Sequence, residues 1–189
     1  MQNQIKSMIN ESSETMRLCA QLEQQIEKAA KLVIEALKNN KKIILAGNGG
    51  SSSMSSHIAA EFTGRYKIER KGMPAISLTT DLAAITSIGN DYGFDSIFER
   101  QIEALGNEGD VFIALSTSGN SKNLIKAVEA AKKLNVHVIG LLGKDGGKLK
   151  NTSKVEIIVP SDNIPRIQEA HLMILHIICE LVEKELFGK

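Results

Sequence analysis

Long apolar runs, a net charge of one sign and paired cysteines are all missing from this sequence, and each absence excludes a class of protein. No apolar stretch approaches the roughly 18 to 20 residues that a membrane-spanning helix needs. The 23 basic and 22 acidic residues leave a formal net charge of +1. No global field therefore draws the chain to nucleic acid or to an anionic membrane, and we expect neither as a partner.

The two cysteines, Cys19 and Cys179, are far apart in the sequence and fit no zinc or redox spacing. We expect both to be reduced residues of helices. The chain begins with the polar residues 1–4 and shows no apolar signal region, so we expect a cytoplasmic protein. A chain of 189 residues is about one domain and can bury a sizeable core.

Apolar residues recur near the helical period through residues 1–39, which predicts an N-terminal helical arm. Five short apolar runs then alternate with helical patterns: Ile43–Ala46, Ala75–Leu78, Val111–Leu115, Val136–Leu142 and Val155–Val159. This order predicts an α/β three-layer sandwich in which helices cover both faces of a five-stranded, mostly parallel sheet. We expect one domain, made of the arm (1–39), an α/β core (40–163) and a C-terminal helix (164–189).

The C-terminal helix is unusual because positions 170–182 are almost all apolar, with His171, His176 and Glu180 as the polar exceptions. A helix that is apolar all round must be covered on every side, and the sheet covers only one. We expect the N- and C-terminal helices to build a homo-oligomer. The alternative is that the two helices cover each other within one chain.

Two serine-rich segments, Gly47–Ser53 and Leu115–Ser121, each follow a strand-like run and begin a helical pattern. In a parallel sheet, such loops direct backbone N–H groups and the positive end of a helix at a ligand. No lysine follows Gly49 or Gly50 as an ATP-binding loop requires, and Ser52 stands where a dinucleotide loop has its third glycine. The pattern therefore favours a small phosphorylated or polyhydroxylated ligand over ATP or NAD.

Downstream of the first loop, the spacing of His57, Glu61 and Arg65 predicts one face of a helix. Taken alone this could be a surface ion-pair ladder, but its position beside the loop favours a site. Gln168 and His176 are polar positions beside the apolar surface of the last helix. A lone histidine there is more often a core residue, yet with His57 and Glu61 these two complete a plausible ligand set for a divalent metal such as zinc.

Geometry limits this metal hypothesis, because Gln168 and His176 are eight residues apart, a rise of about 12 Å along a helix. Both reach one ion only if they bend inward from opposite sides or come from different subunits. We assign no role to His137 or His171.

Together these segments resemble the phosphoheptose isomerases, enzymes with a sugar isomerase (SIS) fold related to the flavodoxin-like sheets. The likeness covers nearly the whole chain and is carried by residues 46–51, 57–66, 89–94, 116–121 and 166–171. It implies aldose–ketose isomerisation of sedoheptulose 7-phosphate to D-glycero-D-manno-heptose 7-phosphate, the first step toward the heptose of lipopolysaccharide or capsule. It also implies a zinc-dependent cytoplasmic homotetramer with active sites at subunit interfaces.

The resemblance also implies roles for individual residues. Glu61 and His176 would be the acid/base pair, and the zinc ligands would be His57, Glu61, Gln168 and His176. Contacts to the phosphate and nearby hydroxyls would come from Ser116, Thr117, Ser118 and Ser121. The rest of the substrate would meet Asn48, Gly49, Gly50, Ser51, Glu61, Asn90, Asp91 and Gln168. One departure is Pro165, which stands where some relatives have an acidic residue before Arg166.

Three alternative functions follow from the same fold. Non-catalytic relatives that associate with the bacterial replication initiator share the serine-rich loops, but they lack the Glu61 and His176 pair that this chain retains. An isomerase of a pentose or hexose phosphate would keep the chemistry and change the pocket length. A regulatory domain that senses a sugar phosphate would normally accompany a DNA-binding module, of which the sequence shows no sign.

Overall fold

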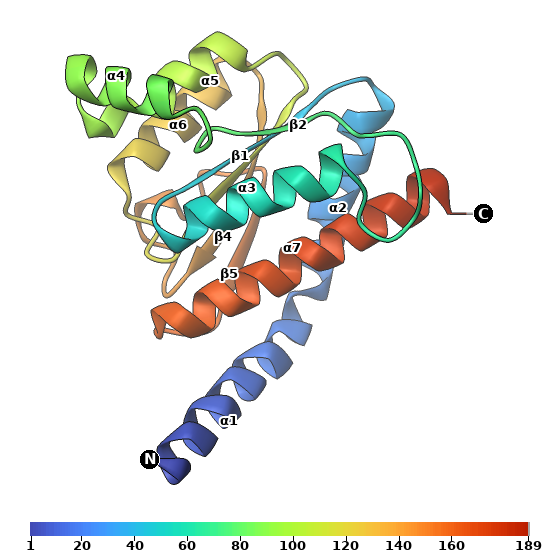
Figure 1. Ribbon diagram of the computed structural model, residues 1–189, viewed down its shortest axis with the longest axis vertical. Helices are drawn as coiled ribbons and strands as arrows, with labels where there is room; N and C mark the ends of the chain where they lie inside the picture. The colour runs from blue at the N-terminus through green and yellow to red at the C-terminus, as the bar shows by residue number, and fades with distance from the viewer. Residues whose placement is uncertain (189) are drawn as a thin grey trace.

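The computed structural model describes residues 1–188, so Lys189 of the predicted C-terminal segment lies outside the described residues. Its centre is a five-stranded sheet in the order β2-β1-β3-β4-β5 (Figure 1). The strands are β1 (Ile43–Gly47), β2 (Ala75–Ser77), β3 (Val111–Ser116), β4 (His137–Gly143) and β5 (Val155–Val159). All four strand pairs are parallel, so the expected mostly parallel sheet is parallel throughout.

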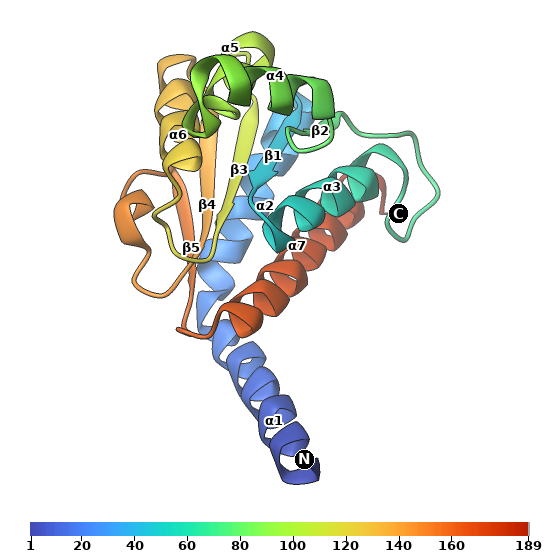
Figure 2. The same ribbon diagram turned by 60° about the vertical axis from the view of Figure 1, so that its left-hand side comes forward.

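Helices cover both faces of this sheet, as expected, because its strands are apolar on both sides (Figure 2). Ile43 and Leu45 face one core, whereas Ile44 and Ala46 face the other, following the two-residue period of a strand. The first core includes residues of α2 (Glu23–Lys38), α3 (Gly50–Thr63) and α7 (Ile164–Phe187). The second packs beneath α4 (Leu82–Tyr92), α5 (Glu99–Leu105) and α6 (Lys122–Lys133).

The N-terminal arm is interrupted where one continuous helical pattern was expected. A short 3-10 turn at Cys19–Leu22 separates α1 (Gln2–Leu18) from α2. Beyond this turn α1 projects away from the sheet and leaves Ile5, Met8 and Ile9 exposed (Figures 1 and 2). The contact between α1 and the start of α7 is polar and includes a 2.7 Å hydrogen bond from the Ser12 hydroxyl to the Glu169 carboxylate.

The C-terminal helix α7 packs against α2 and α3 and buries nine residues. The terminal helices therefore cover each other in part within one chain, through the contact between α2 and α7, as the alternative to an oligomer predicted. Ile177 and Leu181 nevertheless remain 37% and 40% exposed.

Cys19 and Cys179 are buried and free. Among residues 1–188, no helix combines the length and apolar character needed to cross a membrane.

Candidate active site

The first predicted loop joins β1 to α3 at the carboxyl edge of the sheet. Gly49 has φ of +56°, a conformation that glycine adopts without steric cost, and α3 begins at the next residue. The side-chain amides of Asn48 and Asn123 exchange two hydrogen bonds of 3.0 and 2.9 Å. Asn123 lies in the first turn of α6, so this pair joins the two serine-rich segments. Asn123 was not predicted from the sequence, where its place just after the second loop was its only signal.

The second predicted loop joins β3 to α6 beside the first, because β1 and β3 are neighbours in the sheet. Ser116 is buried, and its hydroxyl accepts a 3.0 Å hydrogen bond from the Gly119 N–H. Gly119 has φ of +63°, and a Cβ there would lie 1.8 Å from the carbonyl oxygen of Gly146. Ser121 precedes α6, but its hydroxyl makes no capping hydrogen bond. The loop thus holds a fixed shape and leaves hydroxyl groups available to a ligand.

His57, Glu61 and His176 form a compact polar group in which each residue offers one ligand atom and all three atoms lie within 4.8 Å of one another. His57 and Glu61 are one turn apart on α3, and His176 comes from α7. The Nε2 atoms of the two histidines are 3.0 Å apart. Glu61 Oε1 lies 3.5 Å from His57 Nε2. The expected approach of α3 and α7 at these three residues is therefore present.

Burial lowers the pKa of His176 below its ordinary value, and the neighbouring His57 lowers it further, while Glu61 opposes both. His176 is therefore a neutral imidazole near pH 7, the form that ligates metals or accepts a proton. The side chain of His57 is 47% exposed and that of Glu61 is 21% exposed, so the group is open on one side in a single protomer.

Arg65 does not extend this group along the helix, which corrects the predicted stripe of three residues. The helix α3 ends at Thr63, because Gly64 turns the chain away. Arg65 lies on the following loop, exposed, with its Nε 3.5 Å from Glu69 Oε2.

Gln168 contacts the first loop, about two turns of α7 away from His176. Its Nε2 atom lies 2.8 Å from the place where a Cβ on Gly50 would stand. The absence of a side chain at Gly50 thus makes room for Gln168. Its role as a fourth metal ligand stays a prediction.

Asn90 and Asp91 are exposed near the end of α4, where the Asn90 amide donates a 2.8 Å hydrogen bond to the Asp91 carboxylate. The helix α4 packs toward the second core, whereas α7 packs toward the first. Within one chain these two residues are therefore on the other face of the sheet from His176, and their predicted contact with the sugar stays a prediction.

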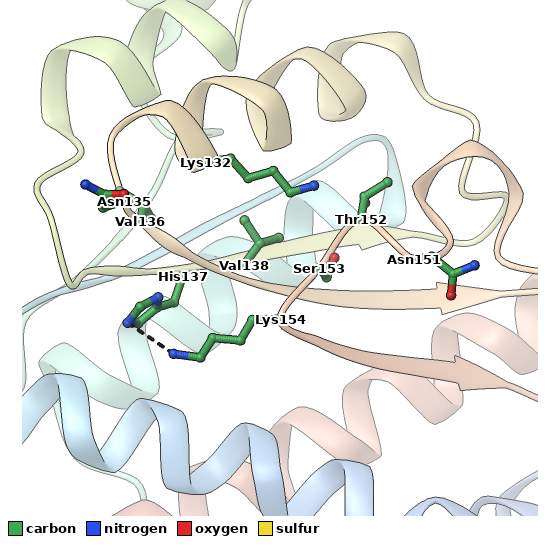
Figure 3. Close-up of a pocket in the computed structure, with 9 residues that line it drawn as sticks. All are labelled: Lys132, Asn135, Val136, His137, Val138, Asn151, Thr152, Ser153 and Lys154. Atoms are coloured by element: carbon green, nitrogen blue, oxygen red, sulfur yellow. Dashed lines mark hydrogen bonds between the residues drawn. The ribbon is translucent and has the colours of Figure 1, made fainter.

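A cavity of about 450 Å³ lies at the amino end of β4, the edge of the sheet opposite the serine-rich loops (Figure 3). His137 and Lys154 border it and are 3.4 Å apart, with the His137 Nε2 as the acceptor. Figure 3 shows Lys132 on the other side of the strand from these two side chains. The basic groups therefore do not converge, and this cavity is separate from the candidate active site.

Comparison with known proteins first defines the class. The family described as the SIS domain matches residues 9–143, which is most of the chain. The chain also belongs to the phosphoheptose isomerase family. It is 53% identical over 186 residues to the phosphoheptose isomerase of Clostridium acetobutylicum, covering 98% of this chain and 94% of that protein.

Two solved structures agree with this assignment. The phosphoheptose isomerase of Neisseria gonorrhoeae is 41% identical, with a TM-score of 0.91, and the match covers 97% of this chain and 98% of that one. The Francisella tularensis phosphoheptose isomerase is 39% identical, with a TM-score of 0.93, and the match covers 96% and 97% of the two chains. The family and fold expected from the resemblance are confirmed.

Proposed function

We propose that this chain is an aldose–ketose isomerase that converts sedoheptulose 7-phosphate into D-glycero-D-manno-heptose 7-phosphate in heptose biosynthesis. Family membership over nearly the whole chain supports this reaction. The observation that carries it for this molecule is the group of His57, Glu61 and His176, two of which lie on the helix that begins at the first serine-rich loop. A carboxylate and a neutral imidazole face each other where a bound sugar phosphate would place its carbonyl end.

The reaction moves a carbonyl between adjacent carbons. A base removes a proton from C1 of the ketose, the electron pair forms the C1–C2 double bond of an enediolate, and a proton is then delivered to C2 while the O1 proton moves to O2. Glu61 and His176 are the groups that hold and deliver these protons. They come from two different helices with their ligand atoms within 4.8 Å of one another, a separation that supports transfer between neighbouring carbons.

The same three residues fit a divalent cation, and we propose zinc. Two imidazole nitrogens and one carboxylate oxygen are the donor types that zinc takes, and their spacing allows one ion to contact all three. His57, Glu61 and His176 would hold the ion, with Gln168 as the proposed fourth ligand. When bound, the ion supplies a Lewis acid that stabilises the oxygen on which negative charge develops.

The serine-rich loops would anchor the substrate. The phosphate would accept hydrogen bonds from Ser116, Thr117, Ser118 and Ser121. The free hydroxyl of Ser121 and the rigid backbone at Gly119 support this placement. The sugar would lie against the first loop, at Asn48, Gly49, Gly50 and Ser51, with further contacts to Glu61, Gln168, Asn90 and Asp91.

We further propose a homotetramer whose active sites lie between subunits. An apolar groove of about 390 Å³ along α2 and α7 supports a second copy as its occupant, since Met16, Ile26, Met173 and Ile177 line it. The exposed apolar face of α1 and the open side of the His57 group support the same arrangement. A partner subunit could then bring Asn90 and Asp91, or a second Gln168, to the site.

A panel of sugar phosphates tests the substrate. The zinc-loaded protein is incubated separately with sedoheptulose 7-phosphate, fructose 6-phosphate and ribulose 5-phosphate, and aldose formation is followed by NMR. We expect conversion of the heptulose alone. Preferential conversion of a shorter sugar would move the assignment to another sugar phosphate, and binding without conversion of any would favour the non-catalytic binding protein.

A further inference from the structure

A buried ion pair joins the loop after α3 to the outer part of α7. Arg70 Nε and Glu183 Oε1 are 2.9 Å apart, and each side chain is only 1% exposed. The two residues are 113 positions apart in the sequence. Removing one partner of such a pair leaves an uncompensated buried charge, so the link is strong only while both residues are present.

Arg70 takes the place of a helix cap at the end of α3. Gly64 there is not in the left-handed conformation that usually ends a helix (φ −86°, ψ −112°), and the last turn holds no basic residue. The Arg70 guanidinium instead donates hydrogen bonds of 2.8 to 2.9 Å to the carbonyl oxygens of Glu61, Phe62 and Gly64. It therefore stabilises the turn of α3 that carries Glu61.

Glu183 fixes the loop that follows. Its carboxylate accepts hydrogen bonds from three successive backbone N–H groups, those of Tyr66, Lys67 and Ile68, at 3.0, 2.7 and 2.8 Å. Burial alone would raise the pKa of Glu183, but these donors and Arg70 outweigh it and hold the pKa below its ordinary value. The carboxylate is therefore ionised and sets the backbone position of Tyr66.

The ring of Tyr66 covers one face of His176. The two rings are stacked, with centroids 5.6 Å apart and an angle of 25° between their planes. The ring of His57 meets His176 edge-on, at 5.2 Å and 85°. His176 thus contacts both rings, and the stacked ring of Tyr66 stands where it would hinder rotation of the imidazole.

We propose that the Arg70–Glu183 pair positions Tyr66 against His176, and that Tyr66, Arg70 and Glu183 are positioning residues for the isomerase reaction. The pair connects the two helices that carry the active group, because Arg70 holds α3 at Glu61 and Glu183 lies on α7 two turns beyond His176. The catalytic part of this inference rests on the proposed function, whereas the placement of the rings does not.

NMR of the histidine rings tests the placement without any substrate. The chain has four histidines, so the His176 ring signals can be assigned with a His176→Gln variant. Tyr66→Leu removes the aromatic ring and is expected to shift the His176 signals, whereas Tyr66→Phe leaves them near their original positions. Glu183→Gln is expected to shift them in the same direction as Tyr66→Leu. The control is Glu185→Gln, on the same helix as Glu183, which breaks an exposed pair with Lys38 of α2.

His176 signals that stay in place in Tyr66→Leu, or in folded Glu183→Gln, would overturn the placement. If Glu183→Gln does not fold, Arg70→Lys tests the same link, because lysine keeps the charge but cannot reach three carbonyl groups at once. A shift of His176 in Arg70→Lys supports the link, and an unchanged signal rejects it.

Kinetics test the catalytic role. Tyr66→Leu is expected to lower kcat by roughly 10- to 100-fold with little change in KM, as for other residues that orient an active-site histidine. Tyr66→Phe should restore the wild-type kcat, and Glu185→Gln should not change it. An active wild type whose Tyr66→Leu variant keeps its full kcat would overturn the role. An inactive wild type would instead contradict the proposed function and leave the NMR result to decide the placement.

Discussion

At the scale of single residues, Glu61 has two proposed roles, as an acid/base residue and as a metal ligand. We expect Glu61→Gln to lower kcat by roughly 10²- to 10⁴-fold, because the amide cannot accept the substrate proton. Thermal unfolding should change little, since the Glu61 side chain is partly exposed and its oxygen is as far as 3.5 Å from its ion-pair partner His57. The control is Glu103→Gln, which breaks an exposed pair with Arg100 on α5. A Glu61→Gln protein with wild-type kcat would remove this residue from the mechanism.

His171, also a single residue, makes stability depend on pH. It is fully buried, and burial lowers its pKa to about 4, while its hydrogen bond to the Leu142 carbonyl opposes the shift. Between pH 6.5 and pH 4 the unfolded chain therefore binds a proton that the folded chain does not. Lowering the pH through this window should remove roughly 3 kcal/mol from the free energy of unfolding.

Urea unfolding of the metal-free protein at a series of pH values checks this effect. His171→Gln should flatten the stability profile between pH 6.5 and pH 4, because glutamine does not titrate. The matched control is His137→Gln, which makes the same replacement at the sheet edge and not in the core. An equal slope in His171→Gln and wild type would show that another group controls acid stability.

At the scale of elements, the rigid second loop depends on Gly119. We expect Gly119→Ala to destabilise the protein by about 1–3 kcal/mol or more, because an L-residue at positive φ is strained and its Cβ would meet the Gly146 carbonyl. Gly89→Ala is the control. Gly89 lies within the helix α4, and a Cβ there would have only Ile97 nearby, at an ordinary contact distance of 3.8 Å. Thermal melting of both variants measures the difference. Equal melting temperatures would contradict the constraint.

Elements with continuous apolar runs were predictable from the sequence. The strand β1 was expected at Ile43–Ala46 and ends one residue later, and β5 was expected at its observed bounds. The break between α1 and α2 was not predictable, because residues 19–22 contain neither glycine nor proline to mark it. Arg65 was placed on the helix by its spacing, since periodicity alone did not show that Gly64 ends α3.

The group of His57, Glu61 and His176 was also predictable from local sequence pattern, whereas the residues that support it were not. His57 and Glu61 follow a recognisable loop, and His176 interrupts an apolar helix, so local pattern singles out all three. Arg70 and Glu183 lack such a signal, because a charged residue that meets a partner 113 positions away looks like any surface charge in the sequence. Only the packing of α3 against α7 brings that pair together.

At the scale of the whole molecule, the proposed oligomer should depend on the groove along α2 and α7. Ile177→Glu introduces a charge into that groove, and we expect light scattering to show a smaller species than the proposed wild-type tetramer. Leu105→Glu is the control, because Leu105 is similarly exposed, at 38%, but lies on α5 near the other face of the sheet. A monomeric wild type, or an unchanged mass in Ile177→Glu, would contradict this interface.

The central claim is that the chain isomerises sedoheptulose 7-phosphate through an enediolate. The most direct test is NMR of the zinc-loaded wild-type protein with this substrate in D2O, observing aldose signals and deuterium on the carbons next to the carbonyl. We predict conversion together with deuterium incorporation, both lost in Glu61→Gln. A protein that binds the sugar phosphate yet neither converts it nor exchanges its protons would contradict the account.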